Sequence, residues 1–281
     1  MGTEKRIHSD LAIPPGEYLA EVLDARRMSQ AELARRTGRP VQAINEIIKG
    51  EKALTPETAL QLERALGVPG HIWTGLESRY QLVRAKNEEE KLIRKELPYL
   101  HKTPYKRLME LGCVARTRDS VHKVRELHRF YGISSLGNLR KTRTYESAFR
   151  ARGAGKESGF ALAAWLRCGE ARAEEVRTEA FEKTKLRAAL NEIKSDAARG
   201  TQRASLTDAR QRLAACGVAL VSAPGFPGVS ADVAVFWLRV DKAVLLMREE
   251  GTGAAVFQDR LVQGLSCLLL HKKTTFIERR A

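Results

Sequence analysis

Five closely spaced side chains near the N-terminus have the chemistry that reads the edges of DNA bases. Gln42 carries an amide that pairs with adenine through two hydrogen bonds, Val41 contacts a thymine methyl group, and Arg39 reaches guanine or phosphate. Asn45 and Glu46 follow on the same outward face of a predicted helix. The spacing therefore predicts a short helix whose N-terminal half enters the major groove.

Three further polar residues flank this helix at positions suited to the phosphate backbone. Gln30 begins the preceding helix, whereas Lys49 and Lys52 lie around the end of the reading helix. Phosphate contacts fix the position of a protein on duplex DNA without reading its sequence. We predict this positioning role for all three residues.

Start and stop signals indicate how the reading helix is held. Ser29 with Glu32 three residues later forms a capping box, which begins the preceding helix. Gly38 ends that helix, because a left-handed glycine permits a sharp turn. The reading helix is then predicted from about Pro40 to Lys49. A short helix, a tight turn and a second helix are typical of a helix-turn-helix module.

Two more helices complete the predicted module at residues 15–67. The first buries Leu19, Val22 and Leu23, which recur at three- and four-residue spacing. The last begins at Thr55-Pro56 and ends at Gly67. A four-helix packing unit without a DNA role is the alternative interpretation of the same pattern.

A family resemblance extends over residues 7–86. It is carried by I-P-P-G-E-Y-L-A-E-V-L, S-Q-A-E-L-A, I-N-E-I-I-K-G, L-T-P-E-T-A-L-Q-L-E-R-A-L-G and I-W-T-G-L-E-S-R-Y. These segments resemble the HigA family of antitoxins, a branch of the phage-repressor-like (XRE) helix-turn-helix regulators. The resemblance implies binding to the protein's own promoter, usually as a dimer. Arg39-Pro40-Val41 departs from the hydrophobic-Ser-polar start expected in that family, which leaves the operator sequence open.

The positive charge of the chain is unevenly distributed. The net charge is +15, but residues 1–90 carry 13 basic and 14 acidic residues, and the remainder carries 36 and 20. The excess therefore lies outside the predicted reading module. It indicates either solvated helix faces or a second surface that follows the DNA backbone and adds salt-dependent affinity.

Composition also limits the location and the redox chemistry of the chain. No apolar run approaches the roughly 20 residues that cross a bilayer, and the first ten residues show no signal segment, so we expect a cytoplasmic protein without a membrane partner. The four cysteines are far apart in the sequence and have no C-x-x-C pairing. In the cytoplasm they are expected to be small buried side chains rather than disulfides or zinc ligands.

The second half of the chain predicts a helical region followed by a small sheet. Residues 160–167 predict a buried helix containing Trp165, and residues 171–193 predict another long helix. Short apolar runs at 218–221, 234–238 and 243–246 predict strands, the last two joined by a hairpin turn at 239–242. An apolar helix follows at 257–271.

A second resemblance covers roughly residues 104–278. It is carried by A-A-W-L-R-C-G-E, G-V-A-L-V, W-L-R-V-D-K-A-V-L and L-L-L-H-K-K-T-T-F-I-E, which look like the ImmA/IrrE metallopeptidase-like domain. That family carries H-E-x-x-H just before its L-L-H stretch, two histidines binding zinc and the glutamate acting as base. Anchoring on Leu269-Leu270-His271 places Gln263, Gly264 and Cys267 at those three positions.

These replacements remove the chemistry that the resemblance implies. A catalytic zinc needs about three protein ligands and an open site, whereas only Cys267 of the three can bind zinc. We therefore expect no metal, no cofactor and no enzyme activity, and a pseudo-peptidase scaffold that serves partner binding, sensing or dimerisation. A regulator with residual peptidase activity is the alternative.

The expected fold is mainly α with a small α+β C-terminal domain. It comprises a helix-turn-helix domain at 1–86, a charged linker or helix at 87–103, and a helical region with a degenerate zincin-like domain at 104–281. The expected function is a sequence-specific transcriptional regulator, an antitoxin or repressor that binds double-stranded promoter DNA as a homodimer. Action mainly through binding to a toxin protein is the other hypothesis.

Overall fold

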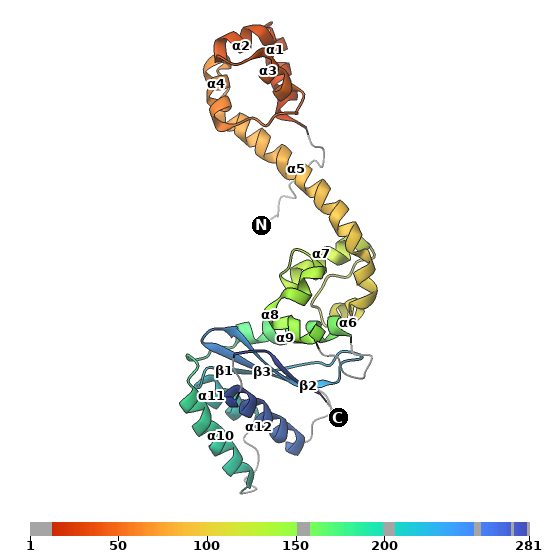
Figure 1. Cartoon of the computed structure of the whole chain (residues 1–281), viewed down its shortest axis with the longest axis vertical. Helices are drawn as coiled ribbons and strands as arrows, with labels where there is room; N and C mark the ends of the chain where they lie inside the picture. Colours follow the sequence, from red (N-terminus) through yellow and green to blue (C-terminus); the bar gives the residue numbers. More distant parts are fainter. Residues whose placement is uncertain (1–12, 151–157, 199–205, 250–253, 271–272, 280–281) are drawn as a thin grey trace, which may run out of the picture. The chain divides into compact units, whose positions relative to one another are not determined.

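The computed structural model describes residues 13–150, 158–198, 206–249, 254–270 and 273–279 (Figure 1). The chain divides into an N-terminal unit, Met1–Leu92, and a C-terminal unit, Ile93–Ala281. Residues 1–12 and His271, which entered the sequence analysis, lie outside the described residues. Among those described, no helix combines the length and apolar character that crossing a bilayer requires.

The N-terminal unit is a bundle of short helices around one core. Its elements are α1 (Pro15–Ala25), α2 (Gln30–Thr37), α3 (Val41–Ile48), α4 (Pro56–Leu66) and most of α5 (Gly70–Glu96). Leu19, Leu33, Ile44, Leu62 and Trp73 are fully buried in this core. The four helices predicted from residues 15–67 are therefore confirmed.

The signals predicted for α4 mark both its start and its end. Thr55 Oγ1 accepts a hydrogen bond from the Thr58 N–H at 3.3 Å and so caps α4, and Pro56 is the first helical residue. Gly67 ends α4 at a φ of 65°, in the left-handed region. The charged run at 87–95 is helical and lies within α5.

The C-terminal unit begins with a helical layer. Its elements are η1 (Leu97–Lys102), α6 (Tyr105–Glu110), α7 (Ser120–Tyr131), η2 (Leu136–Lys141), α8 (Arg143–Arg150) and α9 (Gly159–Glu175). Trp165 of α9 is fully buried, as predicted, and its indole N–H donates a hydrogen bond to the Ala223 carbonyl at 3.4 Å. The layer therefore packs on the sheet that follows it in sequence.

A four-stranded mixed sheet forms the centre of the C-terminal unit. Its strands are β1 (Val218–Ala223), β2 (Ala231–Arg239), β3 (Lys242–Arg248) and β4 (Phe276–Arg279), in the order β1-β3-β2-β4. β1 runs parallel to β3, whereas β2 is antiparallel to both β3 and β4. The three predicted strands and the β2–β3 hairpin are confirmed, but the sequence analysis did not predict β4.

Both faces of this sheet are buried. α9 covers one face, and α10 (Lys183–Ala198), α11 (Leu206–Ala214) and α12 (Ala254–Leu270) cover the other (Figure 1). Side chains alternate between the faces along each strand. In β3, Leu246 belongs to the core under α9, whereas Leu245 belongs to the core under α10–α12.

The prediction of one continuous helix at residues 171–193 was wrong. α9 ends at Glu175, and α10 begins only at Lys183. The intervening backbone bonds to distant segments instead: Phe181 N–H donates to the Asp241 carbonyl at 2.8 Å, and Glu182 N–H donates to the Cys216 carbonyl at 3.2 Å. Tertiary hydrogen bonds thus replace the intrahelical ones that the local pattern favours.

Candidate nucleic-acid interface

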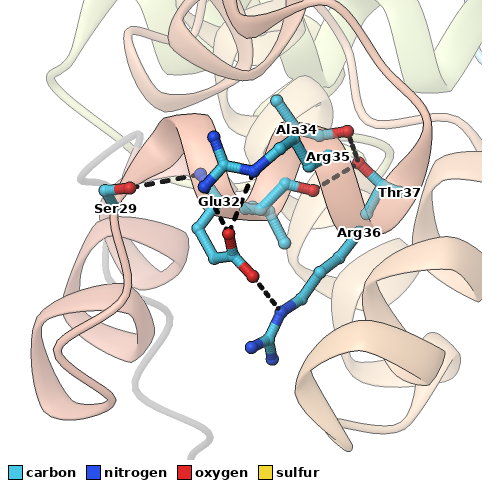
Figure 2. A network of polar contacts seen from close by, with 7 residues as sticks. Ser29, Glu32, Ala34, Arg35, Arg36 and Thr37 are labelled. Carbon is cyan, nitrogen blue, oxygen red and sulfur yellow. Dashed lines mark hydrogen bonds and ion pairs between the residues drawn. The ribbon is translucent and has the colours of Figure 1, made fainter.

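The polar network of α2 organises the helix that precedes the turn. Ser29 Oγ accepts a hydrogen bond from the Glu32 N–H at 3.1 Å, which confirms the N-terminal cap (Figure 2). The Glu32 carboxylate lies 2.5 Å from Arg35 Nη2 and 2.8 Å from Arg36 Nε. The hydrogen bond from Arg36, followed by that from Arg35, lowers the pKa of Glu32. Both arginines are therefore paired along α2 in the free protein.

A left-handed glycine produces the turn between α2 and α3. Gly38 has a φ of 65° and a ψ of 26°, a region that side chains disfavour. The N–H of Arg39 then donates to the Ala34 carbonyl at 2.9 Å, which closes the end of α2. Pro40 is the N-cap of α3, and Val41 is its first residue. The turn is thus as tight as the sequence predicts.

α3 presents one apolar and one polar face. Ile44 and Ile47 are buried in the core, whereas Val41 and Gln42 are exposed. Val41 is 48% exposed, so its methyl groups are accessible for contact. Of the residues predicted to face outward on this helix, Val41 and Gln42 are exposed, whereas Asn45 and Glu46 are half-buried.

Two side chains that the sequence assigns to base recognition are already held in place. Gln42 Nε2 donates to Glu46 Oε1 at 2.9 Å, one helical turn along α3. Arg39 Nε donates to Gln61 Oε1 of α4 at 2.5 Å. The sequence analysis missed Gln61, because a pairing between residues 22 positions apart leaves no local signal.

The remaining predicted residues lie at the start of α2, within α3 and just after α3. Asn45 and Glu46 are half-buried, Lys49 is exposed, and Gln30 is the first residue of α2. Lys52 Nζ lies 3.8 Å from Glu46 Oε2. The eight predicted side chains thus belong to α2, α3, the turn between them and the segment after α3.

Close backbone packing fixes the position of α3 against α1. A Cβ atom built on Gly16 would lie 2.1 Å from the Ile47 carbonyl oxygen and 2.4 Å from that of Ile48. Only glycine allows the two helices to approach this closely. The C-terminal end of α3 therefore rests directly on the start of α1.

The residues at the expected zinc-binding positions of α12 do not form a metal site. Gln263 donates a side-chain hydrogen bond to Glu278 of β4. A Cβ atom built on Gly264 would lie 2.3 Å from Leu245 Cδ1, so position 264 packs against the sheet. Cys267 is half-buried, and burial, with a further contribution from Glu278, raises the pKa of its thiol. Among the described residues, no three His, Cys, Asp or Glu side chains cluster in a metal-binding arrangement.

Comparison with known proteins finds a matching family and two relatives that cover part of the chain. Residues 19–73 match the helix-turn-helix family. The chain is 32% identical over 82 residues to virulence-associated protein I of Dichelobacter nodosus, a match that covers 29% of this chain and 76% of that protein. It is 31% identical over 72 residues to the uncharacterized HTH-type transcriptional regulator YddM of Escherichia coli K12, covering 26% and 77% of the two chains.

One solved structure also matches part of this chain. It is an addiction module antidote protein of the HigA family from Coxiella burnetii, 34% identical in sequence. The match covers 30% of this chain and 94% of that chain, with a TM-score of 0.28. The family match at residues 19–73 includes the helices that position Arg39, Gln42 and their neighbours.

Proposed function

We propose that this chain, which belongs to the helix-turn-helix family, is a transcriptional regulator that reads a specific sequence in duplex DNA with α3. The observation that supports this proposal is the exposed pair Val41 and Gln42 at the start of α3, directly after the left-handed turn at Gly38. Such a turn allows the N-terminal end of a second helix to approach base edges in the major groove.

The contact with Glu46 prepares Gln42 for reading adenine. A glutamine amide nitrogen carries two hydrogens, of which Glu46 accepts one. The second hydrogen and the amide oxygen remain available for N7 and N6 of adenine. Because the amide is oriented before binding, less side-chain freedom is lost when the DNA is bound.

Arg39 has the corresponding role at the turn. Its Nε atom is held by Gln61, which leaves the terminal nitrogens of the guanidinium group to reach guanine or phosphate. Gln30, Lys49 and Lys52 supply phosphate contacts around this reading surface. We expect two copies of the chain to bind a palindromic site in the promoter of its own gene, because one reading helix covers only a half-site.

A binding experiment tests this function. The probe is the duplex immediately upstream of the protein's own coding sequence, compared with a shuffled duplex of equal length by fluorescence anisotropy at fixed salt. We expect the double variant Arg39→Ala with Gln42→Ala to lose roughly tenfold or more of the preference for the upstream duplex, since each bidentate base contact contributes about 1–3 kcal/mol of discrimination.

The matched control for this experiment is Gln81→Ala. Gln81 lies on α5 and donates to Glu77 at 2.7 Å, the same amide–carboxylate pairing one helical turn apart that Gln42 makes. We expect this variant to bind both duplexes as the unaltered protein does. An unchanged preference in the Arg39/Gln42 double variant would show that α3 does not read the site.

We propose that the C-terminal unit is a scaffold without peptidase chemistry. It serves partner binding or sensing. The close packing of Gly264 on Leu245 supports it, because a glutamate at position 264 needs space that the Leu245 side chain fills. Gln263, Gly264 and Cys267 do not fit a catalytic zinc site, because only Cys267 can bind zinc. Metal analysis of the purified protein tests this proposal, and one tightly bound zinc per chain would contradict it.

A further inference from the structure

Two thiols from distant parts of the sequence lie together in the C-terminal unit. Cys113 follows α6 in an exposed turn, and Cys168 lies in the middle of α9. Their Sγ atoms are 4.0 Å apart, although 55 residues separate them along the chain. Neither a C-x-x-C motif nor any local pattern indicates this pairing. Cys168 and Cys216 are buried as expected and Cys267 is half-buried, but the expectation of a buried side chain is wrong for Cys113.

The two thiols have opposite surroundings. Cys113 is exposed at the surface, whereas Cys168 is only 6% exposed and lies behind it. The hydrogen bond between them, helped by the positive charge of Arg172, lowers the pKa of Cys113 to about 7. The same hydrogen bond, with burial, raises the pKa of Cys168. An accessible thiolate backed by a protonated thiol is the arrangement of a reactive cysteine and its resolving partner.

We propose that Cys113 and Cys168 form a peroxide-responsive pair, in which Cys113 is oxidised first and Cys168 then closes an intramolecular disulfide. The oxidant is a hydroperoxide such as hydrogen peroxide. The inference concerns the C-terminal unit alone and does not depend on the proposed DNA-binding function.

The reaction balances in two steps. The Cys113 thiolate attacks one peroxide oxygen, the O–O bond breaks, and hydroxide leaves, so that Cys113 becomes a sulfenic acid. Cys168 sulfur then attacks Cys113 sulfur, the S–O bond breaks, and the departing hydroxide takes the thiol proton as water. Two thiols lose two electrons in total, and both peroxide oxygens are reduced to the level of water.

The fold allows the required approach of the two sulfur atoms. A disulfide needs an S–S distance of about 2.05 Å, so the sulfur atoms must approach by roughly 2 Å. Cys113 lies in a turn directly after Gly112, which has a φ of 72°. Cys168 is fixed, because α9 packs against the sheet through residues such as Trp165. The movement therefore falls on the turn that carries Cys113.

The test uses the full-length reduced protein treated with hydrogen peroxide. We expect peptide mapping to identify one disulfide that joins Cys113 to Cys168 within a single chain. In Cys168→Ser, Cys113 cannot be resolved, so it should accumulate as a sulfenic acid that dimedone traps. In Cys113→Ser, Cys168 should stay reduced, since it is buried and its accessible partner is gone.

The matched control is Cys267→Ser, which removes a half-buried thiol of α12 and should leave the disulfide yield unchanged. Circular dichroism of each reduced variant verifies that it remains folded. If Cys113 reacts with peroxide no faster than Cys267 in the unaltered protein, the proposal is wrong. It is equally wrong if the disulfide joins two chains or involves a different pair.

Discussion

The packing of α1 on α3 predicts a strong and specific effect of adding a single methyl group. In Gly16→Ala the new Cβ would lie 2.1 Å from the Ile47 carbonyl oxygen and 2.4 Å from that of Ile48, whereas real Cβ contacts stay above 3.0 Å. The helices must therefore separate by about 0.9 Å at this point. Both clashing atoms belong to the backbone of α3, so no side-chain rotation relieves the contact.

The expected loss of unfolding free energy in Gly16→Ala is estimated from overpacked substitutions in other proteins. Inserting a methyl group into a well-packed contact destabilises a protein by about 1–3 kcal/mol. For a unit of 60–100 residues, each kcal/mol lowers Tm by roughly 4–8 °C. We therefore expect the N-terminal unit of Gly16→Ala to melt roughly 10 °C below that of the unaltered chain.

Gly75→Ala is the matched control, because both positions are helical glycines of the N-terminal unit. Nothing lies within 4 Å of a Cβ at Gly75, which stands in α5. An open helical position favours alanine over glycine by about 0.5–1 kcal/mol. The same chemical change should therefore stabilise the unit at Gly75 and destabilise it at Gly16.

Hydrogen exchange followed by mass spectrometry measures this effect within the full chain. Peptides from α1 and α3 of Gly16→Ala should exchange between about fivefold and 150-fold faster, since 1.4 kcal/mol corresponds to a factor of ten. Peptides from β3 provide an internal reference. Similar exchange rates in the Gly16→Ala and Gly75→Ala variants would refute the close contact between α1 and α3.

Three further predictions concern charge, helix capping and thiol reactivity. If Lys49 and Lys52 bind phosphates, replacing either by alanine should reduce the slope of log K against log salt by about 1 and weaken binding to all duplexes alike, as salt titrations would measure. Ser29→Ala removes the hydrogen bond to the start of α2 and should lower the unfolding free energy of the N-terminal unit by about 1 kcal/mol, as hydrogen exchange of that unit would detect; Ser29→Asp should restore it. Alkylation of Cys113 by iodoacetamide should rise with pH to half its maximum near pH 7, because the thiolate reacts and predominates above the pKa of about 7. Cys168→Ala removes the Cys168 hydrogen bond and should move this midpoint upward, and an unmoved midpoint would contradict that cause.

The N-terminal unit could be predicted well because its signals are local. The cap at Ser29, the glycine at Gly38 and the Thr55-Pro56 start each act within one helical turn, so the sequence around them determines where helices begin and end. Short continuous apolar runs likewise predict β1 and β3, which are buried on both faces.

The features that escaped prediction depend on contacts between distant residues. The break after Glu175 is made by hydrogen bonds to Asp241 and Cys216, which no property of the local segment reveals. β4 has only four residues, and its pairing with β2 gives it its structure.

The same applies at the level of single side chains. The contact of Arg39 with Gln61 joins two helices, and that of Cys113 with Cys168 joins a turn to a helix. The sequence could therefore supply the residue types of the candidate site, but not the neighbours that orient them. Whether the eight predicted residues bind DNA remains a prediction for the binding experiment.

The sheet of the C-terminal unit also has an evolutionary consequence. Since Leu245 and Leu246 point into separate cores, neighbouring positions of β3 are constrained by different sets of helices. A change of volume at Leu246 acts on the core under α9, and one at Leu245 acts on the core under α10–α12, with only the strand backbone shared. The two faces of the sheet can therefore be repacked independently of each other.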